Sequence, residues 1–547
     1  YEDASNQTET INFALGSNGE RGSFGLYATA YNGSINYRDD FDFIVERSGG
    51  VLLSSSGSPD EYRTLDPQTG AFGSTKIIDP FCGEAGQVVQ GNNCSYNFFD
   101  HTSPVPKNNR LSIFAEFDYD LGQLFGFEEL KAFGEVSYAQ NTTTRAFGPQ
   151  INGNGEYGGR FLIPSSHPFN FFVDDADGLQ YIDPTTATGA QFWQQNPNAA
   201  ANLTTSGNFR PIGAAIAGRN GRGNDYVNNS DRHMLGIDAF RGNWSVSAWY
   251  QNYEHENRFI AEGDSIASGL QSGLMDGTLN PFGIAYALPD FISPKDGIST
   301  AAHDLDSYND NIGYTTTNIR TSLQETLDFV MSNGEVFELD AGYVGVAFGY
   351  QKRQETFTFT PDRITSSGLG SVASRSLSVN GETDVDSVFV EVAIPALENL
   401  DIQLALRYED HGEDVGTTTD PKIAALYKIT DDVLLRASYG SSFQAPTAIQ
   451  TGGITSNTGV DFLTSNGRVT CNTENAQAGD FIADTSAKVL GKLNPQSADN
   501  INLGLVWQAS TISRVSVDYW QYDYDGLIVN AQSPQAVLVS DCNDGIL

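Results

Sequence analysis

The dominant pattern along the chain is strict alternation of apolar and polar residues, which is typical of a β-strand with one covered face. Clear examples are residues 111–119, 244–250, 388–394, 402–408 and 501–507. We count roughly fourteen to sixteen such segments, many of them about ten residues long, whereas helical periodicity is hard to find. The pattern therefore predicts an all-β protein.

The length of these segments favours strands that cross a membrane. A tilted strand needs about nine to eleven residues to span a bilayer, whereas an ordinary strand has about five or six. The apolar faces often end in Tyr, Trp or Phe, as in an aromatic girdle, and the opposite faces carry Gly, Ser, Asp, Glu, Arg and Gln. We therefore predict a transmembrane antiparallel β-barrel, with a large soluble β-protein as the alternative.

The connections between the segments are of two kinds. Some are tight turns, such as 397–400 and 430–432, and others are very long. This contrast is typical of outer-membrane barrels, which have short periplasmic turns and long extracellular loops. The long connections are expected at about 142–230, 256–316, 355–378 and 447–493.

Charge and motifs narrow the functional classes. The 547 residues include 30 Lys and Arg against 68 Asp and Glu, a formal net charge of −38, which argues against a nucleic-acid partner. No nucleophile elbow, phosphate-binding loop or catalytic triad is found, so no enzymatic activity is expected.

Four cysteines lie in loop-like segments, and none forms a C-x-x-C pair. We expect two disulfides, Cys82–Cys94 and Cys471–Cys542, in an oxidising compartment. Four unpaired thiols are the alternative.

The region from about 385 to 525 carries a set of connected motifs. They include the run Leu435-Arg436-Ala437-Ser438-Tyr439-Gly440-Ser441-Ser442-Phe443-Gln444-Ala445-Pro446, preceded by Asp420-Pro421-Lys422 and followed by Leu493-Asn494-Pro495-Gln496-Ser497. Together with the strands around them, these motifs resemble the barrel region of TonB-dependent outer-membrane receptors. The resemblance implies the plugged, 22-stranded class of barrel in the outer membrane of a Gram-negative bacterium.

The resemblance also implies a function. Such a receptor binds a scarce nutrient (a siderophore, haem, cobalamin or an oligosaccharide) at its extracellular loops and imports it with energy from the TonB–ExbB–ExbD complex. The other expected partners are membrane lipid, lipopolysaccharide and a surface lipoprotein or other outer-membrane protein. Neither the plug domain nor the TonB box is found in the sequence. We therefore expect residues 1–547 to be part of a longer barrel protein that lacks its plug and its last strands, with closure by partner chains as the alternative.

Inner-wall residues can be placed from the alternation. Arg407 and Arg436 fall on the polar faces of their segments, where they are expected to pair with carboxylates such as Glu391 and Glu409. The resemblance adds the plug as a further partner of this inner wall.

Two sets of loop residues are candidates for binding. Exposed aromatic side chains at Phe169, Phe171, Phe172 and Trp193 would stack on a sugar or grip an apolar ligand, or they would pack the long loops together. The oxygen-rich loop with Asp304, Asp306, Asn309 and Asp310 is a possible Ca²⁺ site, and Asp174–Asp177 is a second one. No other cofactor is expected.

Two further functional classes remain open from the sequence. One is an outer-membrane scaffold that docks a partner protein without transporting anything. The other is a soluble, secreted β-rich lectin or glycosidase.

Overall fold

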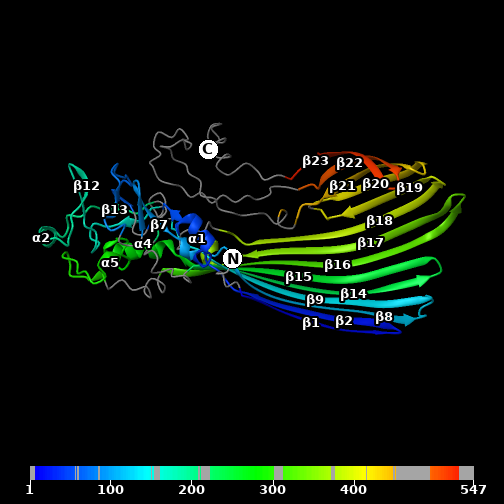
Figure 1. Ribbon diagram of the computed structural model, residues 1–547, viewed down its shortest axis with the longest axis horizontal. Coiled ribbons are helices and arrows are strands. Elements are labelled where there is room, and N and C mark those ends of the chain that lie inside the picture. Colours follow the sequence, from blue (N-terminus) through cyan, green and yellow to red (C-terminus); the bar gives the residue numbers. More distant parts are fainter. Residues whose placement is uncertain are drawn as a thin grey trace.

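The alternating segments form one large antiparallel sheet. The computed structural model describes residues 7–55, 57, 61–83, 87–148, 151–152, 160–206, 210, 222–300, 312–370, 376–413, 415–447, 450 and 493–528. Fourteen strands pair in the order β1-β2-β8-β9-β14-β15-β16-β17-β18-β19-β20-β21-β22-β23 (Figure 1). The prediction of an all-β protein with roughly fourteen to sixteen long strands is confirmed.

The strands of this sheet are long, and all neighbours are antiparallel. Their bounds are β1 (Thr8–Gly19), β2 (Gly22–Gly33), β8 (Lys107–Gly122), β9 (Glu129–Ala146), β14 (Gly223–Arg241), β15 (Trp244–Ser265), β16 (Gly313–Leu339), β17 (Gly342–Thr360), β18 (Val379–Leu397), β19 (Leu400–Asp410), β20 (Thr417–Thr430), β21 (Val433–Gln444), β22 (Gln496–Ser510) and β23 (Ser513–Asp525).

The register gives the sheet one apolar and one polar face. Val390 of β18 pairs with Leu406 of β19, and both are largely exposed, at 43% and 45%. The next pair, Phe389 with Arg407, points to the opposite face. Large apolar side chains exposed at alternate positions are what a lipid-facing surface requires, and the polar side chains line the inner, lumen-facing surface.

Glycines on the inner face make room for aromatic rings. Gly349 of β17 pairs with Phe389 of β18, and Gly236 of β14 pairs with Phe133 of β9. In each case the ring occupies the place that a Cβ on the glycine would fill. The rings therefore lie flat over the neighbouring strand and cover backbone that the glycine leaves bare.

The two ends of the sheet differ in their connections, as expected. Tight turns join the strands at one end, and long segments join them at the other (Figure 1). The four predicted loops occupy 147–222, 266–312, 361–378 and 445–495, so the strands beside the first three run beyond the predicted limits. The added residues of β9 and β14 are mostly polar, whereas Phe357 and Phe359 of β17 alternate with threonines and mark the continuation of that strand.

One long connection was not predicted as such. Residues 34–106, between β2 and β8, form a fifth long segment on the same side as the others. The sequence does indicate a long connection here, because no long alternating segment occurs within 34–106 and two cysteines lie close together in it.

The long connections carry short elements of their own. The short strands are β3 (Leu53–Ser54), β4 (Glu61–Thr64), β5 (Ile77–Ile78), β6 (Gln87–Gln90), β7 (Asn93–Asn97), β10 (Leu162–Ile163), β11 (Phe172–Asp175), β12 (Gly178–Tyr181) and β13 (Leu203–Thr204). The helices are α1 (Asp42–Ser48), α2 (Ala187–Gln195), α4 (Ala267–Asp276), α5 (Ile284–Ala287) and α7 (Arg363–Ser367), with 3₁₀ turns at Arg38–Asp40 and Phe99–His101.

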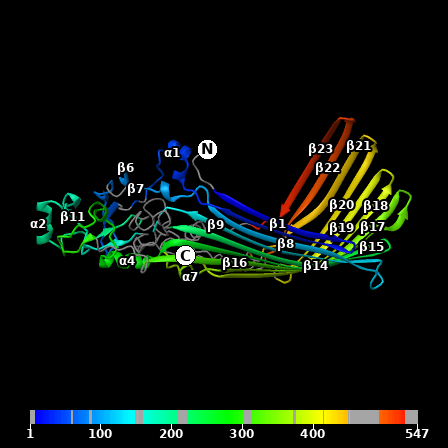
Figure 2. The same ribbon diagram turned by 60° about the horizontal axis from the view of Figure 1, so that its bottom comes forward.

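The main sheet is curved, and its edges are β1 and β23 (Figure 2). Among the described strands no pairing joins these two edges. Within the described part of the chain, no helix is both long enough and apolar enough to cross a membrane.

Candidate functional site

The long loops share a hydrophobic core of their own, which we call the loop head. Its buried residues come from three connections, namely 34–106, 147–222 and 266–312. The largest fully buried side chains of this core are Tyr62, Phe161, Ile163, Phe169, Phe171, Phe172, Trp193, Leu203 and Phe282. The connection 147–222 contributes most of the buried residues of this core, and residues of the other two connections pack against them.

The four aromatic residues singled out in the sequence lie inside this core. Phe169, Phe171, Phe172 and Trp193 are each exposed by 1% or less, so the expectation of exposed rings is wrong. The ring centres of Phe171 and Trp193 are 5.4 Å apart in an edge-to-face arrangement. These rings therefore pack the loops together, which was the alternative prediction. Ligand contact by any of the four stays a prediction, and it would require this core to open.

Hydrogen bonds fix the aromatic segment in place. The indole Nε1–H of Trp193 donates to the carbonyl of Ile182 at 2.9 Å. Asn170 is fully buried, and its amide donates to the carbonyls of Pro164 and Ala201. Satisfied polar groups allow this segment to be buried without the cost of unpaired donors.

Asp79 connects the first and third of these connections. Its carboxylate accepts hydrogen bonds from the backbone N–H groups of Phe81 (2.9 Å) and Gly283 (3.0 Å) and from the Tyr62 hydroxyl (3.2 Å). The side chain is buried, and the cost of burying its charge raises the pKa of Asp79 to about 6, although the three donors act in the opposite direction.

Lys295 secures the segment that precedes the aromatic core. Its Nζ donates to the carbonyls of Ser165 and His167, both at 3.0 Å, and to that of Asn170 at 3.3 Å. The ammonium also lies 5.5 Å from the centre of the Trp193 ring, within the range of a cation–π contact. Burial lowers the pKa of Lys295 to about 8.

One of the two expected disulfides is present. Cys82 and Cys94 are bonded, with their Cα atoms 5.8 Å apart, and both are buried. Cys471 and Cys542 lie outside the described residues, so their pairing stays a prediction.

The expected Ca²⁺ ligands Asp304, Asp306, Asn309 and Asp310 also lie outside the described residues. In the described part of the chain, no three His, Cys, Asp or Glu side chains gather as a metal site would require. This includes the second candidate, Asp174–Asp177, where Asp175 accepts a hydrogen bond from the backbone of Asp177 within the turn.

The inner wall carries a belt of cross-strand polar contacts. Arg407 Nε donates to Glu409 Oε1 at 2.5 Å, and the other carboxylate oxygen lies 3.2 Å from His411 Nε2. Arg407 also reaches across β18 to Gln351 of β17 at 3.4 Å, and Gln351 in turn donates to Asp328 of β16 at 2.8 Å. The belt therefore links β16, β17 and β19 on the lumen-facing surface, and it crosses β18.

The second predicted arginine pairs with a residue that sequence reasoning missed. Arg436 of β21 forms its ion pair with Asp518 of β23 at 2.6 Å, rather than with Glu391 or Glu409. Glu391 lies exposed on the inner face of β18. Asp518 could be identified as the partner only from the pairing register of β21, β22 and β23, and the sequence pattern does not predict this register.

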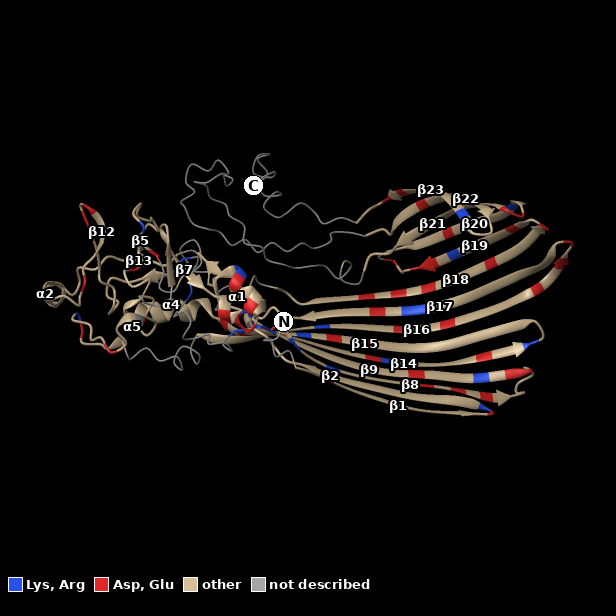
Figure 3. Ribbon diagram, viewed as in Figure 1, with Lys and Arg blue, Asp and Glu red and all other residues tan. Residues whose placement is uncertain are grey.

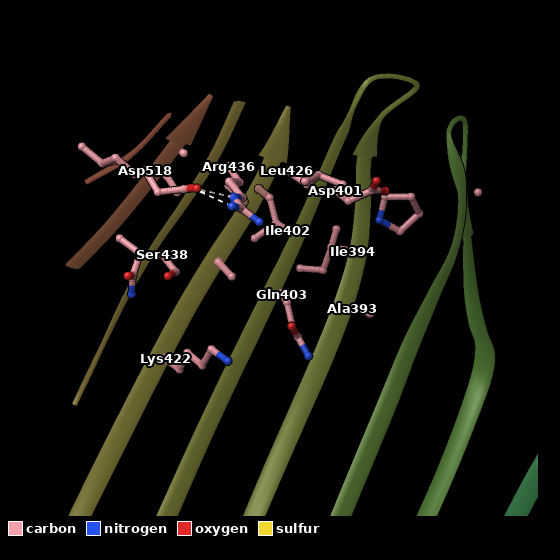
Figure 4. A pocket seen from close by; sticks show the side chains of 18 of the residues that line it. Ala393, Ile394, Asp401, Ile402, Gln403, Lys422, Leu426, Arg436, Ser438 and Asp518 are labelled. Atoms are coloured by element: carbon pink, nitrogen blue, oxygen red, sulfur yellow. Dashed lines mark hydrogen bonds and ion pairs between the residues drawn. The ribbon is translucent and has the colours of Figure 1, made fainter. Parts of the chain in front are cut away.

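The pair lies in a hollow of about 910 Å³ on the inner surface. Figure 4 shows Arg436, Asp518, Lys422, Gln403 and Asp401 around it, contributed by neighbouring strands. The hollow therefore offers both charges and an amide to anything that passes along the wall, and it contains no arrangement of nucleophile and base.

Acidic residues are spread over the strands and the loops, and basic residues are few (Figure 3). The excess of negative charge disfavours anionic ligands through long-range repulsion.

Comparison with known proteins gives the family. The model of the TonB dependent receptor-like β-barrel matches residues 172–540, more than half of the chain. No curated protein matches the chain.

Solved structures with a similar arrangement are receptors. They include the siderophore receptor PirA from Acinetobacter baumannii (12% identity, TM-score 0.46, covering 96% of this chain and 51% of that one). A mutant of the ferric enterobactin receptor PfeA from Pseudomonas aeruginosa, in complex with enterobactin, matches with 13% identity and a TM-score of 0.46, covering 96% and 52%. The ferric-catecholate import receptor Fiu from Escherichia coli K12 matches with 11% identity and a TM-score of 0.41, covering 95% and 57%.

The chain thus spans about half the length of the solved structures that it matches. The large antiparallel sheet of the described residues is consistent with the β-barrel that the matched family model describes. The chain belongs to the TonB-dependent receptors, which are Gram-negative outer-membrane proteins, and residues 172–540 match the model of their β-barrel.

Proposed function

We propose that this chain forms the barrel wall and the extracellular loops of a receptor that binds a scarce nutrient and imports it with TonB-coupled energy. The observation that carries the proposal is the asymmetry of the sheet. Long loops lie at one end, where their described residues share a core, tight turns join the strands at the other end, and a polar inner wall runs between the two ends. A surface for capture is thereby connected to a polar route through the membrane.

The inner wall suits a route for a hydrated solute. Arg407, Glu409 and His411 are linked to one another, and Arg436 is paired with Asp518, so these charges of the wall are compensated. Compensated charges bind a passing solute through hydrogen bonds without holding it as tightly as a bare charge would.

The test is energy-coupled uptake by cells that carry the full natural protein. We would compare the uptake of a ferric catecholate, haem, cobalamin and maltohexaose in cells with the gene, without it, and with the gene but without TonB. We expect one of these solutes to be taken up only when both the receptor and TonB are present. Uptake of none of them, or uptake that is independent of TonB, would overturn the proposal.

A second function is favoured by one observation, the hydrophobic core of the loop head. A folded, disulfide-bonded head is also what a surface scaffold would present to a partner protein, such as a lipoprotein. This alternative predicts that a partner co-purifies with the receptor from outer membranes and that loss of TonB changes no uptake. Replacing head residues would then abolish partner binding alone.

A further inference from the structure

Three aromatic side chains form a ladder along the last described strand of the sheet. Trp520, Tyr522 and Tyr524 occupy alternate positions of β23. The ring centres of Trp520 and Tyr522 are 5.7 Å apart, and those of Tyr522 and Tyr524 are 6.4 Å apart. The three side chains are 65%, 46% and 63% exposed, so the ladder presents its rings to whatever lies beside it.

The ladder faces the lumen and not the lipid. Residues of β23 that pair with the apolar face of β22 have odd numbers, as in Val517 with Leu505 and Tyr519 with Leu503. Trp520 pairs instead with Asn502, and it lies on the same face as Asp518, whose ion pair with Arg436 lines the inner hollow. These aromatics therefore do not belong to a lipid-facing girdle.

Two of the other inward-facing aromatics cover glycines, which the rings of the ladder do not. Phe133 and Phe389 lie over glycines of the neighbouring strands. The partners of the ladder in register are Asn502, Asn500 and Ala498, and no glycine of β22 lies opposite its rings. The rings of the ladder stack on one another and stay exposed, and those of Tyr27 and Phe114 also stack on one another, on the inner face near the other edge of the sheet.

Polar groups adjoin the ladder along its length. Asn502 and Asn500 pair with Trp520 and Tyr522, and Asn502 also lines the inner hollow together with Arg436 and Asp518. The faces of aromatic side chains stack on the apolar face of a ring in a ligand, whereas amide groups and paired charges form hydrogen bonds with the hydroxyl groups of the ligand. A strand advances about 7 Å for every two residues, so the three rings offer successive stacking positions along one line.

The charge of the protein indicates which ring-containing ligands the ladder would bind. Asp523 and Asp525 lie on the opposite face of the same strand and do not border the ladder, but the chain as a whole has a net charge of −38. An anionic ligand would be repelled along this path, whereas a neutral, hydroxyl-rich one would not.

We propose that Trp520, Tyr522 and Tyr524 form a track for the rings of a neutral oligosaccharide, which leads into the hollow lined by Asn502, Arg436 and Asp518. The inference rests on the proposed import function, because the track matters only if a nutrient passes along the inner wall. The proposal adds a substrate class, neutral oligosaccharides, and a set of binding residues to the proposed import route.

The experiment is binding of maltohexaose, cellohexaose and xylohexaose to the full natural protein in detergent, measured by calorimetry. We expect at least one of these sugars to bind, and Trp520→Ala to weaken its binding about tenfold, the equivalent of one lost aromatic contact. Tyr522→Ala should weaken binding as well, and Trp520→Phe should restore most of it. The matched control is Trp507→Ala, which removes a tryptophan from the lipid-facing side of β22 and should leave the affinity unchanged.

Three results would overturn the track. They are no binding of any of the three sugars, equal weakening by Trp507→Ala and Trp520→Ala, and full affinity in the double variant Trp520→Ala/Tyr522→Ala. Retention of the heat-modifiable, folded form on gels shows that a variant still folds. TonB-dependent uptake of another nutrient alongside a failed sugar test refutes the track alone. Loss of all TonB-dependent uptake refutes the proposed function as well.

Discussion

Arg436 and Asp518 form their ion pair across an intervening strand, directly over Gly504. Arg436 lies on β21 and Asp518 on β23, and in register each of them pairs with Gly504 of β22. Any Cβ at position 504 would collide with the carboxylate of Asp518 and with the guanidinium of Arg436. The ion pair between Arg436 and Asp518, which lines the inner hollow, therefore requires a glycine at position 504.

Gly504→Ala should break this arrangement. We expect it to destabilise the folded protein by about 1–3 kcal/mol, because the added methyl group overpacks a site that is already filled. The measurement is the shift of the unfolding transition in detergent. The control is Gly440→Ala on β21, where a Cβ would meet its nearest neighbour, Lys422, at an ordinary 3.4 Å. Equal losses in both variants would contradict the role of Gly504.

Trp193→Ala should unfold the loop head while leaving the sheet intact. The side chain is fully buried, and removing a buried tryptophan costs about 3–5 kcal/mol. Hydrogen exchange should become fast in residues 160–206 and 266–300 and stay slow in β14–β19. The control is Phe125→Ala in a turn at the other end of the sheet, where the ring is 85% exposed. Protection of the loops that is unchanged by Trp193→Ala would contradict the shared core.

Asp79 should make the loop head more stable in acid. Its pKa is about 6 in the folded state against 3.8 for the ordinary side chain, so the folded state holds the proton more tightly. The contribution is fully present below pH 3.8 and is lost as the pH rises through 6, a change of about 3 kcal/mol. Proteolysis of the loops should therefore be slower at pH 4.5 than at pH 7.5.

Asp79→Asn is the control for this pH effect. An amide keeps an acceptor for the Phe81 N–H but does not titrate, so the difference between the two pH values should disappear. The same pH dependence in wild type and variant would assign the effect to another group.

Reduction of Cys82–Cys94 should loosen the first long loop. The two cysteines are separated by 12 residues, and closure of a loop of this length is worth about 3 kcal/mol to the folded state. Cys82→Ser/Cys94→Ser should make residues 61–97 more sensitive to protease without changing the unfolding of the sheet. Equal protease resistance with and without the bond would argue against this contribution.

The sheet could be predicted from the sequence because its signal is local. The alternation of Val390 and Leu406 with their sequence neighbours is enough to predict that both residues face the lipid. No information about distant parts of the chain is needed. The Cys82–Cys94 bond was accessible for the same reason, since both cysteines lie in one short segment.

The interior of the loop head could not be predicted in this way. Phe171 and Trp193 look like exposed loop aromatics because part of their packing comes from another connection, through Phe291 and Lys295. The pairing of Arg436 with Asp518 was hidden for a related reason, as the two residues are 82 positions apart. Their contact depends on a strand between them.

The loop head also limits how such a receptor can be altered. Tyr62, Trp193 and Leu274 belong to one core although they come from three separate connections. Transplanting any one of these loops from another receptor would leave the other two with an unmatched surface. Engineering of a new specificity must therefore exchange the three loops as a set, and in natural variation insertions in one of them should be accompanied by compensating changes in the others.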